Sequence, residues 1–152
     1  MVDPDTDYAL QFFYPTYASP TAIATLRPPE MGDAETKDLR QVHAETGGGT
    51  KIVFTRGPPL FYLSFEFTHV PRVARDLFAT WFSDSVEGAK NTFELRRPKY
   101  HDLDIAELPL GAFLYQGCEF DAGELAWPET ARRGFYGLSL PRIRATSRVD
   151  VA

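Results

Sequence analysis

The chain has 152 residues, a net charge of −5 and a pI of about 5.2. Its length fits one domain, and its 12 Phe, 7 Tyr and 2 Trp are enough to fill a core, which argues against global disorder. The acidic balance argues against a nucleic-acid partner, because domains that bind nucleic acid usually carry a basic patch. No apolar run is long enough to span a bilayer, and the acidic first residues are unlike a signal peptide. We therefore expect no membrane partner and a protein made in the cytoplasm.

Residues 1–25 differ from the rest of the chain because prolines interrupt them repeatedly. Proline lacks the amide donor of a strand and restrains the residue before it, so this stretch cannot form a long paired strand. We expect an extended N-terminal arm, followed by a single β domain over residues 26–152. The rings of the arm must be buried against the chain's own domain or against a neighbouring subunit. The second alternative makes four of them candidates for an assembly interface: Phe12, Phe13, Tyr14 and Tyr17.

Two short segments around a run of glycines predict a β-hairpin. Residues 39–44 and 51–55 flank Gly47, Gly48 and Gly49, which permit positive φ angles in a loose turn. A flexible tip with a function of its own is the alternative to a plain turn. The segment is not a phosphate-binding loop, because the order Gly-Lys-Ser/Thr is absent.

A strand and a helix follow the hairpin in direct succession. Alternate residues from Phe61 to Phe67 are aromatic or aliphatic, so one face of a strand over residues 60–67 is expected in the core. Pro71 suits the first turn of a helix, where a missing amide hydrogen costs nothing, and Thr68 is a candidate cap.

The helix is predicted over residues 72–83 and carries a wide apolar stripe. Two series with a spacing of four residues form the stripe: Val73, Leu77 and Trp81, and Ala74, Phe78 and Phe82. Burial of the large side chains contributes about 1.5–3 kcal/mol each, so Trp81→Ala is expected to cost about 3–5 kcal/mol. Strand and helix together give the predicted core: Phe65, Phe67, Leu77, Phe78, Trp81 and Phe82.

Further strand patterns cover residues 92–95, 112–121 and 134–146, with mainly polar loops between them. The last segment is a strand pair or one bent strand, and Pro141 requires an edge position or a bulge within it. Several strands with a single amphipathic helix predict a mainly β (α+β) fold. We expect a β-sandwich or a partly closed barrel with the helix packed on the sheet.

No pattern typical of a catalytic, cofactor-binding or metal site stands out. The three histidines are scattered and lie outside zinc-motif spacings. His101, Asp102 and Asp104 offer ligands for an incidental divalent ion, although a solvated loop is the favoured interpretation. Cys118 has no neighbouring base and, as the only cysteine, excludes an internal disulfide. We expect no enzyme activity, no cofactor and no metal.

The carboxylates around residue 120 allow one enzymatic alternative. Glu119, Asp121 and Glu124 contain a conceivable glycosidase pair, which needs two carboxyl groups facing each other across a cleft roughly 5–9 Å apart. Nothing else in the sequence indicates a cleft. A charged strand edge or the rim of an interface is therefore the favoured interpretation.

The last third of the chain adds arginines and an aromatic residue to the interface candidates. Arg142, Arg144 and Arg148 alternate on a predicted strand, where they are either solvated or in contact with another subunit. Trp127 lies in the loop before this strand. Arg142, Arg144 and Trp127 are accordingly predicted at an assembly interface. The alternative function is a small carbohydrate- or ligand-binding β module with an aromatic platform of Trp127, Tyr100 and Tyr115.

One order of segments is shared with a known group of proteins. It comprises Leu26-Arg27-Pro28-Pro29-Glu30-Met31-Gly32-Asp33, the glycine tip 47–49, Arg56, the aromatic strand 61–67, the helix 73–82 and the late strands 135–143. This order resembles minor tail, collar and tail-tip proteins of long-tailed bacteriophages, which have tail-tube-like or distal-tail-like domains. The likeness covers residues 26–146 and departs at Arg97-Pro98-Lys99-Tyr100, where many relatives carry a Gly-Arg or Asp-x-x-Gly turn.

The resemblance implies a structural protein of the virion tail. Its partners would be further copies of itself, in a ring, and other tail proteins such as the tail tube or the tail tip. Independently of the resemblance, the proline-interrupted aromatic segment and the edge-like strands favour a protein that completes its burial with partners.

Overall fold

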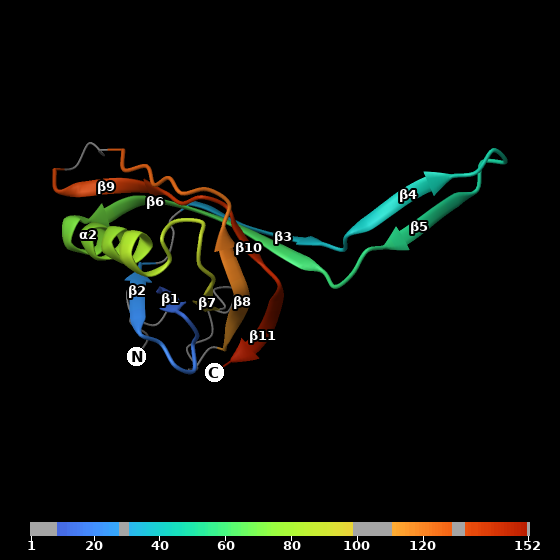
Figure 1. The fold of residues 1–152 in the computed structure, drawn as a ribbon. Coiled ribbons are helices and arrows are strands. Elements are labelled where there is room, and N and C mark those ends of the chain that lie inside the picture. Colours follow the sequence, from blue (N-terminus) through green and yellow to red (C-terminus); the bar gives the residue numbers. More distant parts are fainter. Residues whose placement is uncertain (1–8, 28–30, 99–110, 129–132, 152) are drawn as a thin grey trace.

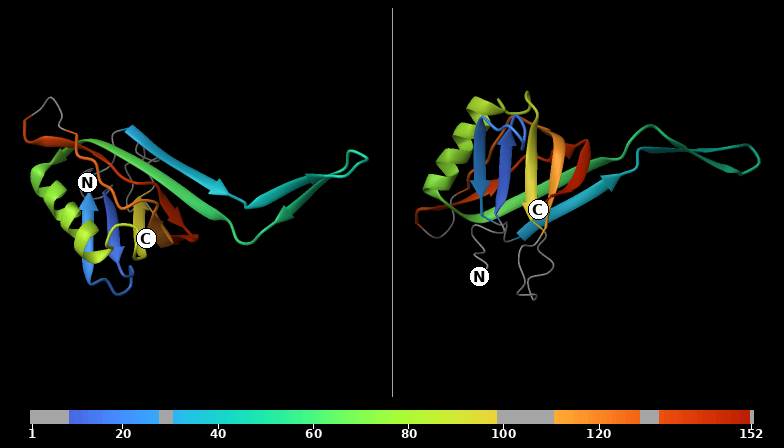
Figure 2. Two further views of the ribbon diagram at one scale, coloured as in Figure 1. Left: turned by 45° about the horizontal axis from the view of Figure 1, so that its top comes forward. Right: turned by 90° about the horizontal axis from the view of Figure 1, so that it is seen from below.

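The computed structural model describes residues 9–27, 31–98, 111–128 and 133–151. The fold is mainly β, and one short helix packs on a sheet that curls into half of a barrel (Figure 1). This confirms the predicted fold class, a mainly β fold with one helix on the sheet. A two-stranded hairpin extends away from this body (Figure 2).

The elements of the described residues follow one another with short connections. In chain order they are β1 (Leu10–Tyr14), β2 (Ala22–Leu26), β3 (Met31–Asp38), β4 (Gln41–Glu45), β5 (Lys51–Thr55), β6 (Leu60–Pro71), α2 (Arg72–Thr80), the π-helical turn η1 (Trp81–Ser85), β7 (Phe93–Pro98), β8 (Ala112–Phe120), β9 (Phe135–Ser139), β10 (Ile143–Ala145) and β11 (Ser147–Val151).

The strands of the body pair in the antiparallel order β2-β1-β7-β8-β10-β6-β3. β11 lies beside β8, and β9 lies beside β6. β8 therefore has β7 along one side and two strands in succession, β11 and β10, along the other. The sheet curls where β8 exchanges one of these neighbours for the other.

Gly117 marks that exchange. β8 pairs with β11 up to Gln116 and with β10 from Glu119 onward. Gly117 has a φ of 62°, and a Cβ atom there would collide with the side chain of Thr146. Glycine adopts this left-handed conformation without strain and leaves room for the crossing strand, so Gly117 provides the bend that gives the sheet its half-barrel shape.

The core lies between α2 and the inner face of the sheet, and aromatic rings fill most of it. The ring of Phe12 lies 5.2 Å from Phe78 and 5.4 Å from Trp81, and Phe93 stacks on Phe120 at 4.7 Å. Five of the six residues predicted for the core are buried: Phe65, Phe67, Phe78, Trp81 and Phe82.

Leu77 is the exception, and its assignment to the core is wrong. Its side chain is 66% exposed, and Val73 one turn before it is 72% exposed. The helix packs on the sheet along a line formed by Ala74, Phe78, Trp81 and Phe82. Successive residues lie about 100° apart around a helix, so Val73 and Leu77 lie to one side of this line and their side chains face solvent. Of the two predicted series, the one with Ala74, Phe78 and Phe82 packs on the sheet, whereas only Trp81 of the other series is buried.

We expect Trp81→Ala to lower the free energy of unfolding by about 3–5 kcal/mol and Leu77→Ala to change it by less than about 0.5 kcal/mol. The Trp81 ring packs between Phe12 and Phe93, at 5.4 and 5.3 Å, so its removal leaves a cavity. Leu77 is exposed, so its truncation leaves none. Chemical denaturation of both variants checks the pair, and an equal loss for the two would contradict this assignment of the helix faces.

The N-terminal segment is part of the body. β1 lies between β2 and β7, so Phe12 and Phe13 are buried within this chain. Tyr14 packs against the core, and Tyr17, 38% exposed, lies edge-on against Phe13 at 5.0 Å. The expectation of a separate arm with Phe12 and Phe13 at an assembly interface is therefore wrong. The prolines leave room for two strands of five residues, which is enough for pairing.

The boundaries of the central strand and helix also differ from the prediction. β6 continues to Pro71, and α2 begins at the next residue. Pro71 itself occupies the cap position, and the hydroxyl of Thr68 lies 3.0 Å from Nδ1 of His69 instead of capping the helix. β11 has no counterpart among the predicted strands. Neither described helical segment has the length and apolarity needed to cross a bilayer.

Candidate assembly interface

The hairpin of β4 and β5 projects from the body, and within the described residues its two strands pair only with each other (Figure 1). The pairing runs from Gln41 and Thr55 at the base to Glu45 and Lys51 at the tip. Every residue of the two strands except Val42 is exposed. The glycine turn in the sequence predicts this hairpin but not its isolation from the rest of the sheet.

The tip of the hairpin is a closed turn held by its own hydrogen bonds. The amide of Gly49 donates to the carbonyl oxygen of Thr46 at 2.9 Å, and the amide of Thr50 donates to Oγ1 of Thr46 at 3.1 Å. Gly49 has a φ of 81°, which glycine adopts without strain. The turn is therefore built from local contacts and needs no support from the body.

The hairpin has one apolar face and one mainly polar face. Paired residues of antiparallel strands point to the same side of the ladder, and the side alternates along each strand. The pairs Val42–Phe54 and Ala44–Ile52 therefore form the apolar face, on which Phe54 is 57% exposed and Ile52 is 38% exposed. The opposite face carries Gln41, His43, Glu45, Lys51, Val53 and Thr55.

Such a hairpin is incomplete as a structural unit. A two-stranded ladder alone is only marginally stable in water. The outer edges of β4 and β5 have no strand neighbour among the described residues, so their unpaired backbone groups are a template for pairing. A partner that covers the apolar face or an edge would stabilise the ladder, and this makes the hairpin the candidate interface of the chain.

A bend separates the hairpin from the β3–β6 pair of the body (Figure 2). Arg40 has a φ of 55° and Gly57 a φ of 146°, and the amide of Arg56 donates to the carbonyl oxygen of Arg40 at 2.9 Å. Pro58 and Pro59 follow and cannot donate to a ladder. These residues interrupt the ribbon and set the direction in which the hairpin projects.

An open concavity lies at this bend, at the base of the hairpin. Its charged groups are two guanidinium groups and one carboxylate, and the carboxylate of Asp38 accepts a hydrogen bond from the amide of Arg40 at 2.8 Å. Within the described part of the chain, neither Arg40 nor Arg56 takes part in an ion pair. The concavity is lined by Asp38, Arg40, Gln41, Val42, Arg56, Leu60 and Tyr62.

The predicted interface arginines form ion pairs within this chain. Arg142 pairs with Asp121, and Arg144 lies 3.2 Å from a carboxylate oxygen of Glu119. The guanidinium of Arg142 also lies over the ring of Tyr62, 4.4 Å from its centroid, which brings it next to the concavity. Each carboxylate of the conceivable glycosidase pair is therefore matched to an arginine.

The aromatic platform of the alternative ligand-binding function is not formed as predicted. Tyr115 is fully buried, and Trp127 is partly buried against the core. Tyr100 and the loop with His101 lie outside the described residues. In the described ranges no group of three or more His, Cys, Asp and Glu side chains is placed to hold a metal ion.

Tyr115 lies close to a cluster of three charged residues, Glu35, Arg97 and Arg148. A carboxylate oxygen of Glu35 accepts a hydrogen bond from Arg97 at 3.1 Å, and the second oxygen accepts one from Arg148 at 2.8 Å. Arg148 lies on β11 and Arg144 on β10, and Arg142 precedes β10, so the three arginines of the predicted series do not share a strand. Burial raises the pKa of the Tyr115 hydroxyl to about 12 and also raises the pKa of the Cys118 thiol, so this thiol is not a nucleophile.

We expect the free energy of unfolding to fall as the pH rises from 10 to 12. Tyr115 has an ordinary pKa of 10.0 when the chain is unfolded, and its raised pKa of about 12 in the folded state keeps it neutral up to a higher pH. Its contribution to the free energy of unfolding is complete below pH 10. Roughly 2–3 kcal/mol of that contribution is lost as the pH rises toward 12. Tyr115→Phe should remove this part of the pH dependence. Denaturation of both proteins across this range checks it, and identical slopes would contradict it.

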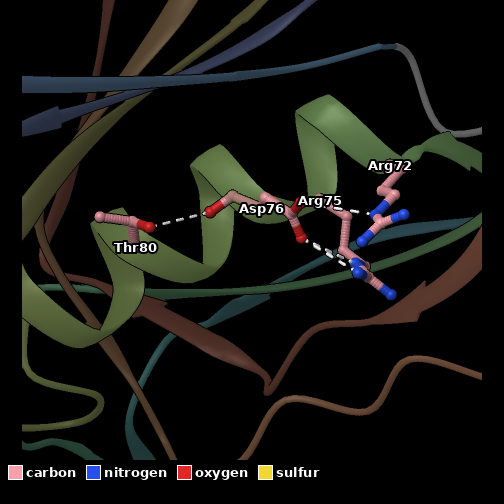
Figure 3. A network of polar contacts seen from close by, with 4 residues as sticks. All are labelled: Arg72, Arg75, Asp76 and Thr80. Atoms are coloured by element: carbon pink, nitrogen blue, oxygen red, sulfur yellow. Dashed lines mark hydrogen bonds and ion pairs between the residues drawn. The ribbon is translucent and has the colours of Figure 1, made fainter.

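The outer face of α2 is a second surface with exposed apolar side chains, those of Val73 and Leu77. The carboxylate of Asp76 accepts hydrogen bonds from Nε and Nη2 of Arg75 at 3.1 and 3.0 Å, and Nε of Arg72 lies 3.9 Å from its second oxygen (Figure 3). The hydroxyl of Thr80 donates to the carbonyl oxygen of Asp76. The charges on this face are therefore paired within the helix.

No protein-family model matches this chain, and a search of curated proteins finds no match.

Proposed function

We propose that this chain is a structural protein of a bacteriophage virion, a minor tail or collar component that forms a ring on the tail tube or tail tip. The observation that carries the proposal is the exposed apolar face of the hairpin, with Phe54 at its centre. Contiguous exposed apolar surfaces on a domain are typical of interaction sites. The resemblance of the segment order to tail proteins indicates which kind of assembly this interaction serves.

The energetics of the hairpin contact favour a closed ring. Ile52 and Phe54 are 38% and 57% exposed, so burying the rest of each side chain contributes only about 0.5–2 kcal/mol. Association costs roughly 4–15 kcal/mol in lost translational and rotational freedom. One hairpin contact between two copies is therefore weak. In a closed ring each subunit gives one such contact and receives one, so no contact surface is left unused.

Light scattering of the purified chain over a range of concentrations tests the assembly. We expect a discrete species of ring size, or a monomer whose mean mass climbs toward one as the concentration rises. Electron microscopy of that species would then show its symmetry. A monomer at every concentration would contradict self-assembly of this chain.

The virion part of the proposal has a separate test. Mass spectrometry of purified phage particles that carry this gene should detect peptides of this chain, in a fixed ratio to the tail-tube protein. Particles that lack the chain would contradict a role in the mature tail, whatever its solution mass.

A further inference from the structure

We infer that the concavity at the base of the hairpin receives the hairpin tip of a second copy of this chain. This inference rests on the proposed self-assembly and adds which surface accepts the hairpin. Four observations carry it: the faces of the ladder, the shape of its tip, the distribution of charge, and the contrast with the outer face of α2.

The apolar face of the hairpin and the lining of the concavity form one continuous surface. Leu60 and Tyr62 lie on the face of β6 that points away from the core, because the residues that alternate with them, Phe61 and Leu63, are buried. Val42 belongs both to the apolar face and to the lining. A second ladder that enters the concavity therefore meets half-buried apolar side chains, and its own apolar side chains lose contact with water.

The tip of the hairpin has the shape for such an entry. Its turn contains Gly47, Gly48 and Gly49, so the end of the ladder carries no side chains at three successive positions. Two paired strands are about 5 Å apart, so the end of the hairpin is narrow. Ala44 and Ile52, the apolar pair nearest the tip, then come to lie against the partner's lining.

The charges of the tip and of the concavity are complementary. The tip carries one acid and one base, Glu45 and Lys51. The concavity offers the guanidinium groups of Arg40 and Arg56 to the acid and the carboxylate of Asp38 to the base. Each charge of the tip thus meets an opposite charge, an arrangement that fixes register as well as adding attraction.

The outer face of α2 is the competing acceptor and fits less well. It presents Val73 and Leu77, but the charges next to them are already paired around Asp76 (Figure 3). A tip that docked there would have to break these pairs or leave its own charges unmatched. The concavity offers charges without ion-pair partners among the described residues, so it is the acceptor favoured by the structure.

Cysteine cross-linking between two single-site variants tests the contact. Ala44→Cys is mixed with Leu60→Cys and oxidised mildly, at a concentration where the wild type is oligomeric. The proposed contact places residue 44 of the tip against the lining that contains residue 60. We therefore expect a mixed disulfide, which forms only when the two Cα atoms come within about 4.4–6.8 Å of each other. The native Cys118 is fully buried and serves as an unreactive background in the wild type. A matched mixture of Ala44→Cys with Leu77→Cys is expected to stay unlinked.

The outcomes separate this inference from the proposed function. A wild type that assembles, with no link from residue 44 to residue 60 or with a link to residue 77, would overturn the acceptor and leave self-assembly standing. A wild type that is monomeric throughout would overturn both. A link to residue 60 supports the acceptor, and the mass of the doubly substituted chain after oxidation then tells a closed pair from a ring.

A charge exchange gives a second test that needs no cross-link. Glu45→Arg is expected to raise the dissociation constant about tenfold, because it places a third cation beside Arg40 and Arg56. Adding Arg56→Glu to the same chain should restore association. Glu124→Arg, at an exposed acid outside the hairpin, is the control and should have no such effect. A double variant as weak as the single one would overturn the assignment of Arg56 to this contact.

Discussion

Deletion of residues 1–20 is expected to prevent the chain from folding. The deletion removes β1, which lies between β2 and β7 and is paired along both of its edges. It also removes Leu10 and Phe12, which are fully buried. Loss of one buried large side chain alone costs about 3–5 kcal/mol, and domains of this size are stable by only about 5–15 kcal/mol. The loss of a whole strand that is paired along both edges exceeds that margin.

Circular dichroism and thermal melting of the truncated chain check this prediction. The expected result is no cooperative transition, whereas the full chain melts cooperatively. Phe12→Ala and Tyr17→Ala form a matched pair of milder changes, because the first ring is fully buried and the second is 38% exposed. A truncated chain that retained a cooperative transition would restore the interpretation of this segment as a detachable arm.

The periodicity of the sequence was sufficient to predict the central strand and helix. In β6 one face is buried from Phe61 to Phe67, so alternation of apolar and polar residues identifies both the strand and its inner face. The same periodicity predicts the helix but not the width of its buried face. Which apolar residues of the stripe face the sheet depends on the position of the sheet, so the pattern does not distinguish exposed Leu77 from buried Phe78.

The N-terminal strands were harder to predict from the sequence. β1 pairs with β7, so that Phe12 lies opposite Leu95, far away along the chain. Local patterns contain no information about such a distant partner. The prolines between β1 and β2 suggest an irregular segment, although they only limit the length of each strand. In this segment the pairing of β1 with the distant strand β7 outweighs the local sequence pattern.

The candidate interface was visible in the sequence only in part. Val42, Ala44, Ile52 and Phe54 alternate with mostly polar residues, so the apolar face follows from the pattern once the hairpin is assumed. The same pattern would suit a hairpin whose apolar face packs on its own core. The face lies in solvent because the bend around Arg40 and Gly57 directs the ladder away from the body.

Phe54→Asp is expected to weaken self-association of the chain at least tenfold without affecting its fold. Phe54 is the largest side chain of the apolar face and is 57% exposed, so its replacement should change the free energy of unfolding by less than about 0.5 kcal/mol. In the assembly the change removes the burial of the exposed 57% of Phe54, about 1–2 kcal/mol, and adds the cost of desolvating a carboxylate. Since each 1.4 kcal/mol is a factor of ten, the dissociation constant should rise at least tenfold.

Val53→Asp is the matched control for this prediction. Val53 lies next to Phe54 on the same strand and is similarly exposed, at 44%, but it points to the opposite, mainly polar face. The two variants introduce the same charge at neighbouring positions of one strand, and they differ in the face that carries the new carboxylate and in the size of the side chain removed. Light scattering and thermal melting of both therefore decide whether one face of the hairpin makes the contact. Equal weakening by the two would mean that pairing along the edges of the ladder, rather than packing of its apolar face, holds the subunits together.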